Sequence, residues 1–230
     1  MQTVFLYVFT NQQNSIIMKK LLLIVALAFT TMMASAQEDN VAYHQVEIGD
    51  LLKYCSTERV VYAGNYGDRK PSLEALLLSF SEAYPNELFY QPIRTQMMGK
   101  NEVSNCVFDK TNGYCSAELL TELSPSFALC YWSKTDGTYL VGLALNGYTY
   151  VEVPGREPDE NATSLASLFF YTLDIGEPFL EPVSADKIMG EKLGSLENYT
   201  IRLPRQGKDI VLEKDGKKTI FRWNNGTFRR

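Results

Sequence analysis

The sequence predicts an α+β domain dominated by an antiparallel β-meander, with one or two helices in its N-terminal third. Two observations lead to this prediction. Between Phe127 and Val153, apolar runs alternate with Asp-Gly and Asn-Gly dipeptides, which is the pattern of consecutive hairpins. Earlier in the chain, Leu73, Leu76 and Phe80 follow the three-and-four spacing of a helix with one apolar face.

The N-terminal third should contain a short strand at Val60–Ala63 and then this helix. Pro71 suits a first-turn position, where a missing N–H removes no hydrogen bond, and Pro85 should end the helix near Tyr84. A second helix or an irregular stretch is expected over Ile93–Met98.

The meander should consist of the strands Phe127–Trp132, Thr138–Leu145 and Tyr148–Val153. The segment Ser133–Gly137 would reverse the chain between the first two strands, and Asn146-Gly147 between the second and third. Because the first strand is apolar on both faces, we expect it to lie centrally and to be covered on both sides.

Further short elements should follow an acidic loop. We expect a strand at Ser167–Leu173, a turn at Gly176–Pro178, a short helix at Ala185–Lys192, and strands at Tyr199–Leu203, Asp209–Glu213 and Thr219–Trp223. The last strands would form a C-terminal β-hairpin (199–230) that is basic, with 9 basic and 3 acidic residues against 11 basic and 24 acidic in 37–198. We expect this tail to pack on its own domain. A contact with a polyanion or an envelope surface is the alternative.

The N-terminal region predicts export. The basic start at Met18, the apolar run Leu21–Thr30 and the small residues before Gln37 have the order and length of a secretory signal peptide, Met18–Ala36. Residues 1–17 are best explained by a start codon assigned upstream of the true one. The remaining residues, 37–230, should form a single domain that is secreted or periplasmic and contains no membrane span.

Several short motifs together resemble those of small, uncharacterised exported proteins of Gram-negative anaerobic bacteria. They are the signal ending Ala34-Ser-Ala-Gln37, the strand Leu129–Trp132, Asp136-Gly137, the run Leu168–Asp174, the segment Leu203–Lys208 and the end Phe221–Asn224. The resemblance implies a secreted or periplasmic globular protein, and it implies no catalytic residue.

The four cysteines are Cys55, Cys106, Cys115 and Cys130. In an oxidising compartment an even number favours disulfides, and the turn-rich segment between Cys106 and Cys115 makes these two a candidate pair. Cys130 lies in an apolar run, where a buried free thiol is equally compatible with the sequence.

Known catalytic and cofactor patterns do not occur in the sequence, so we expect no catalytic residue, cofactor or metal site. His44 is the single histidine and lies close to the expected mature N-terminus, which argues against a Ser-His or Cys-His mechanism. Glu157, Asp159 and Glu160 form an acidic loop that more resembles a solvated loop than a calcium site.

Aromatic residues are the remaining candidates for a binding face, because they offer a large contact area at a small entropic cost. The candidates are Trp132, Tyr139, Tyr148, Tyr150 and Trp223. The leading hypothesis is a non-enzymatic binding protein for a glycan, a peptide or an exported protein, with nucleic acid excluded. The alternatives are a secreted hydrolase that uses two carboxylates, or an inhibitory or structural envelope module.

Overall fold

The computed structural model describes residues 58–65, 70–84, 88–90, 92–93, 104–119, 125–150 and 162–230. The expected signal peptide, His44, Cys55, the acidic loop at 157–160 and most of the second helix expected at 93–98 lie outside these residues. None of the described helices is long and apolar enough to cross a membrane.

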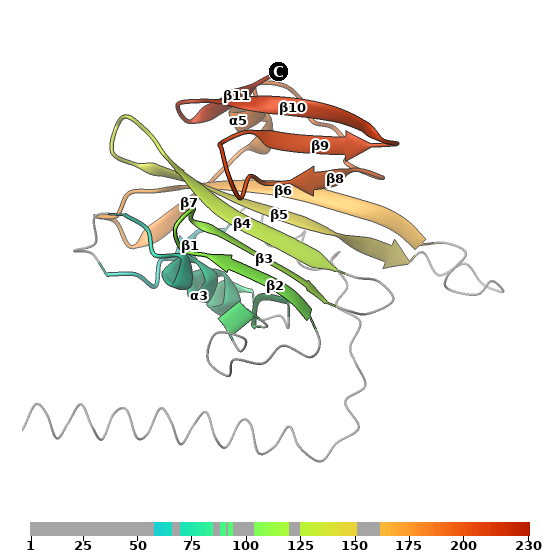
Figure 1. The fold of residues 1–230 in the computed structure, drawn as a ribbon. Helices are drawn as coiled ribbons and strands as arrows, with labels where there is room; N and C mark the ends of the chain where they lie inside the picture. The colour runs from blue at the N-terminus through green and yellow to red at the C-terminus, as the bar shows by residue number, and fades with distance from the viewer. Residues whose placement is uncertain are drawn as a thin grey trace, which may run out of the picture. The chain divides into compact units, whose positions relative to one another are not determined.

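A seven-stranded antiparallel sheet forms the centre of the fold, in the order β1-β7-β6-β5-β4-β3-β2 (Figure 1). Its strands are β1 (Val60–Val61), β2 (Ser104–Asp109), β3 (Tyr114–Leu119), β4 (Ser126–Ser133), β5 (Tyr139–Tyr150), β6 (Ala162–Leu173) and β7 (Phe179–Val183). Strands that follow one another from β2 to β7 are neighbours in the sheet, so the predicted meander is present and longer than expected.

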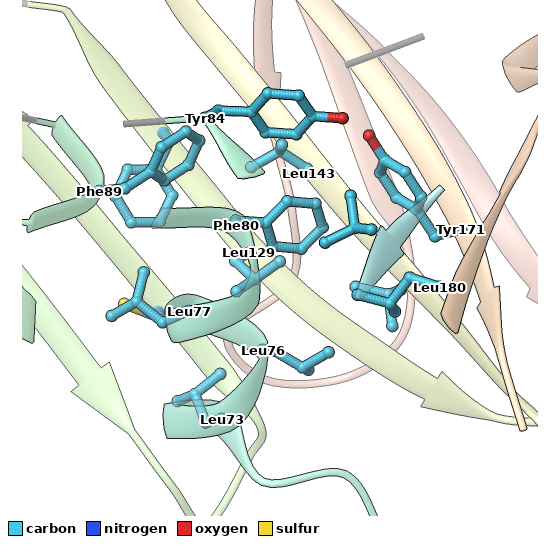
Figure 2. Packing of buried hydrophobic residues seen from close by; sticks show 14 of the residues in the cluster. Leu73, Leu76, Leu77, Phe80, Tyr84, Phe89, Leu129, Leu143, Tyr171 and Leu180 are labelled. Atoms are coloured by element: carbon cyan, nitrogen blue, oxygen red, sulfur yellow. The ribbon is translucent and has the colours of Figure 1, made fainter. Parts of the chain in front are cut away.

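Helix α3 (Leu73–Ala83) covers one face of this sheet. Its first turn is capped by Ser72, whose Oγ accepts a hydrogen bond from the Ala75 N–H (3.2 Å). Pro71 therefore precedes the cap instead of lying in the first turn. The helix ends at Ala83 with Tyr84 as its C-cap, near the predicted end. Figure 2 shows the apolar side of α3, including Phe80, directed at the sheet residues Leu129 and Tyr171.

The opposite face of the large sheet is covered by a second sheet and by α5 (Ala185–Met189). The second sheet is antiparallel, in the order β11-β10-β9-β8, and is drawn in red in Figure 1. Its strands are β8 (Thr200–Arg202), β9 (Ile210–Lys214), β10 (Lys217–Asn224) and β11 (Thr227–Arg229). The protein is thus β-rich and poor in helix, with two antiparallel sheets, and the basic tail forms four strands where a hairpin was expected.

Strand β4 is covered on both sides, as its two-sided apolar pattern predicts. Phe127 and Leu129 belong to the cluster under α3, whereas Ala128 and Trp132 belong to the cluster between the two sheets. These side chains are almost fully buried, so the central strand contributes to both halves of the core.

The turn predicted at Asn146-Gly147 is wrong, because β5 continues through both residues to Tyr150. Asn146 pairs with Ala166 of β6 within the sheet. Its side chain bonds to β8 instead: Oδ1 accepts from the Ile201 N–H (2.9 Å) and Nδ2 donates to the Ile201 C=O (3.5 Å). The asparagine joins the two sheets, and this contact with a distant segment outweighs its local preference for a turn.

In the structure no disulfide joins Cys106 to Cys115, and Cys115 and Cys130 are buried thiols. The register of β2 and β3 explains this. Cys106 lies opposite Ala117 and Cys115 lies opposite Phe108, so the two cysteines are diagonal neighbours. Diagonal positions in an antiparallel pair are roughly 7–8 Å apart, which exceeds the usual Cα separation of a disulfide.

Candidate functional site

A cleft of about 420 Å³ opens where β4 continues past the end of β3. Strand β3 stops at Tyr114, whereas β4 runs on to Ser133 with β5 as its one described strand neighbour. Three segments that are distant in the sequence surround this length of β4, namely Lys70, the turn at 110–113 and the loop at 204–208. We call this hollow the β4 cleft.

The floor of the β4 cleft is the end of a sheet edge, where β4 extends past its last pair with β3. The Leu119 N–H donates to the Pro125 C=O (2.9 Å), so odd-numbered residues of β4 direct their peptide groups toward β3. The register places Tyr131 opposite Gly113, with the Tyr131 N–H directed at the Gly113 C=O. Ser133 lies two residues farther along β4, so its N–H and C=O are the main-chain groups that face the cleft.

The first wall is the turn between β2 and β3, which Asp109 holds in place. Its carboxylate accepts from the Asn112 backbone N–H (3.1 Å) and from the Asn112 side-chain amide (2.9 Å). Arg205 Nε donates to the same carboxylate (2.9 Å) and so ties the loop at 204–208 to the turn. The Asn112 side chain, Arg205 and the Asn112 backbone lower the pKa of Asp109 from 3.8 to about 2.

The second wall is the loop at 204–208, which is hydrogen-bonded to Trp132. The indole Nε1 donates to the Lys208 C=O (3.0 Å). The ring stacks on Trp223, with 5.7 Å between centroids and 16° between planes, and meets Phe228 edge-on at 5.2 Å. Only 4% of Trp132 is exposed, so it is chiefly a core residue whose upper edge reaches the cleft.

Two tyrosines form the side of the cleft that faces α3. The rings of Tyr131 and Tyr139 meet edge-to-face with 5.9 Å between centroids. Burial raises the pKa of Tyr131, and the neighbouring Tyr139 adds to the effect, so the Tyr131 hydroxyl stays protonated at neutral pH. The pair offers a ligand in the cleft ring surface and the neutral Tyr131 hydroxyl group.

The charge of the lining is positive. Lys70 and Lys208 are exposed and contribute their ammonium groups, and the described lining contains no carboxylate. Two acids beside the cleft are already engaged, Asp109 by Asn112 and Arg205 and Glu74 by Lys110. An anionic group would therefore gain two cations in the β4 cleft and meet no free acid.

The structure brings together some of the aromatic residues that the sequence suggested. Trp132 and Tyr139 line the β4 cleft, and Trp223 lies beneath it, stacked on Trp132. Tyr148 and Tyr150 belong to the far end of β5, roughly 30 Å or more from Tyr139 at about 3.4 Å per residue. The side chains of Tyr148 and Tyr150 are not among those that the structure describes. The five candidate aromatic residues do not form one face.

Sequence reasoning missed most of the lining: Lys70, Asn112, Tyr131, Ser133 and Lys208. The signal that could have located the cleft is the segment from Ser104 to Leu119. Its central Lys-Thr-Asn-Gly run is a hairpin turn, and a β2–β3 hairpin shorter than β4 exposes the end of β4.

Within the described residues, no cluster of three His, Cys, Asp or Glu side chains is arranged to hold a metal ion. No family model, curated protein or solved structure matches the chain. The site must therefore be interpreted from its own geometry.

Proposed function

We propose that the protein is an exported binding protein that holds an extended, acidic peptide segment in the β4 cleft. The proposal of export depends on the signal-like segment Met18–Ala36. The proposal of peptide binding depends on one observation, the main-chain groups of Ser133, which point into the cleft beyond the last pair of β3 and β4.

A peptide in the β4 cleft would lie beside Ser133, beyond the point where the pairing of β3 with β4 ends. One residue of the ligand would exchange N–H and C=O hydrogen bonds with Ser133. The turn at 110–113 closes one end of this position. About three residues of the ligand therefore fit beside the open end of β4.

The charged and aromatic side chains around the β4 cleft determine which side chains of a peptide ligand fit. Lys70 and Lys208 favour carboxylates in the ligand, since neither faces an acid in the described lining. Tyr139 offers a ring face for an apolar side chain between two acidic ones. Side chains of a strand alternate in direction, so a ligand with alternating acidic and apolar residues fits both features.

A second candidate ligand is an acidic sugar. Tyr139 and the Asn112 amide are the kinds of groups that contact sugar rings and hydroxyls, and the lysines would hold a sugar carboxylate. This ligand would not need the peptide groups of Ser133, and that difference separates the two candidates by experiment.

The test uses residues 37–230 and a fluorescent hexapeptide with alternating Glu and Val. We expect binding by fluorescence anisotropy, and we expect the Lys70→Gln/Lys208→Gln variant to weaken it about tenfold. The matched control is Lys187→Gln/Lys192→Gln, which removes the same charge from exposed positions away from the cleft and should leave affinity unchanged.

The same peptide with N-methyl groups on alternate amides keeps its charge but cannot pair with a strand. We expect one of the two N-methylation registers to lose binding. Equal affinity for both registers and for the parent peptide would refute strand pairing. Binding of oligogalacturonate without binding of the peptide would establish the acidic-sugar alternative instead.

A further inference from the structure

The outer face of the second sheet carries an excess of exposed cations. Alternation along the strands directs Ile210, Leu212 and Phe221 into the core, where each is at most 4% exposed. The residues between them, including Lys218 and Arg222, face away from the core and are exposed.

The register places these outward residues in rows. Arg202, Val211 and Ile220 lie side by side across β8, β9 and β10, and Ile220 is 49% exposed. In the next row, Arg222 lies directly opposite Arg229 of β11. We call the set Arg202, Val211, Lys218, Ile220, Arg222 and Arg229 the basic face.

Few acids balance the basic face. Glu213 is paired with Arg202 at 3.3 Å, and Asp209 Oδ1 accepts from the Trp223 backbone N–H (3.1 Å). Lys218 lies directly opposite Glu213, which Arg202 already engages. Lys218, Arg222 and Arg229 form no ion pair within 4.0 Å in the described chain. Like charges directly opposite each other on neighbouring strands destabilise a sheet. The fold therefore does not explain the Arg222–Arg229 pair, because neither arginine has an ion-pair partner among the described residues.

We infer that the basic face binds a linear polysaccharide that carries sulfate or carboxylate groups. Two adjacent guanidinium groups can hold one such anion by paired hydrogen bonds. Lys218 lies four residues from Arg222 along β10, roughly 13 Å away, so a single small anion cannot reach both. A chain with a charge on successive sugars reaches all three cations.

A polymer fits this surface better than a lipid bilayer does. Ile220 is the one large apolar side chain of the basic face that is exposed, and Val211 beside it is half-buried. One exposed isoleucine provides little apolar area for insertion into a membrane, whereas three unpaired cations provide charge for a polyanion. Because the basic face lies on β8–β11, binding of a polysaccharide there does not depend on a ligand in the β4 cleft.

The test measures heparin binding to residues 37–230 by isothermal titration calorimetry at low and at physiological salt. We expect Arg222→Gln/Arg229→Gln to reduce the affinity by about tenfold or more. The matched control Lys187→Gln/Lys192→Gln removes two charges elsewhere and should change it less than twofold. The cleft variant Lys70→Gln should leave heparin binding intact, so failure of the peptide proposal would not affect this result.

Stability provides a second readout. If the arginines serve the ligand and not the fold, Arg222→Gln/Arg229→Gln should unfold at the same or a slightly higher temperature, because a like-charge contact is removed. A second variant, Ile220→Glu, puts an acid in the centre of the face at an exposed position and should abolish binding.

Equal losses of affinity in the arginine variant and in its control would overturn the inference, since they would show attraction by net charge alone. Arginine-dependent sedimentation with phosphatidylserine vesicles, without binding to heparin, would also overturn it and would assign the face to a membrane. If Ile220→Glu bound heparin with unchanged affinity, the basic face would be ruled out as the heparin-binding site.

Discussion

At the scale of single residues, Gly142 determines how Trp132 packs between the two sheets. A Cβ at Gly142 would lie 2.8 Å from Trp132 Cζ3 and 3.4 Å from Phe170 Cε1. Trp132 cannot retreat, because Trp223 stacks on it and its Nε1 is bonded to the loop that forms one wall of the β4 cleft.

We therefore expect Gly142→Ala to lower the free energy of unfolding by about 1–3 kcal/mol through overpacking. Chemical denaturation followed by circular dichroism measures this. Gly176→Ala is the control, since a Cβ there would approach Asp174 Oδ1 only to 3.5 Å. Equal stability of the two variants would show that the Trp132 ring has room to move.

The carboxylate of Asp109 predicts a pH dependence. Its pKa is lowered from 3.8 to about 2 by Asn112 and Arg205, so the folded state favours the charged form. The stabilisation is fully present above the ordinary pKa and is lost as the pH falls through about 2. We expect the stability difference between wild type and Asp109→Asn to shrink over this interval.

Nuclear magnetic resonance titration of the Asp109 carboxyl carbon tests the cause directly. Arg205→Gln removes one of the two partners and should move the pKa part of the way back toward 3.8. An unchanged pKa in that variant would mean that Arg205 does not hold the two walls of the cleft together through this carboxylate.

At the scale of elements, Ser72 begins α3 and so fixes the helix that covers one face of the large sheet. Ser72→Ala removes the acceptor for the Ala75 N–H and should lower the free energy of unfolding by about 1 kcal/mol. Ser72→Thr retains a hydroxyl that can accept from the Ala75 N–H and donate to Glu74, and it should be close to wild type. Equal losses in both variants would indicate that another contact of Ser72 matters more than the cap.

Local sequence signals predicted the elements that local chemistry determines. The leucine spacing and Pro85 placed α3 within two residues of its observed end, and Asp136-Gly137 marked the β4–β5 hairpin, where Gly137 has φ +86°. The failure at Asn146 has the opposite cause. Its side chain bonds to Ile201, 55 residues away, and no local pattern contains that partner.

The candidate site was predictable to a smaller extent than the elements. Trp132 and Tyr139 were chosen because they are aromatic, but the main-chain groups of Ser133 matter only because β3 ends before β4 does. The two lysines of the lining, Lys70 and Lys208, come from different parts of the chain. A cleft built at the meeting of distant segments has no contiguous pattern in the sequence.

At the scale of the whole molecule, the fold depends on the basic tail packing as a layer on the large sheet. Phe221 of β10 is fully buried, whereas its neighbour Ile220 is 49% exposed on the outer face of the same strand. The two tryptophans of the chain, Trp132 and Trp223, lie in contact between the sheets. Their fluorescence therefore reports on the contact between the layers.

We expect Phe221→Ala to lower the free energy of unfolding by about 3–5 kcal/mol, because it leaves a cavity between the sheets. Ile220→Ala, the adjacent control, should cost about 0.5 kcal/mol or less, since its side chain faces solvent. If the layers fold as one unit, tryptophan fluorescence and far-ultraviolet circular dichroism will give the same midpoint in wild type. A fluorescence transition at lower denaturant, with most of the circular dichroism signal retained, would instead mean that the tail separates first. The large sheet would then be a folding unit of its own, and the loop at 204–208 would leave the β4 cleft before the rest of the protein unfolds.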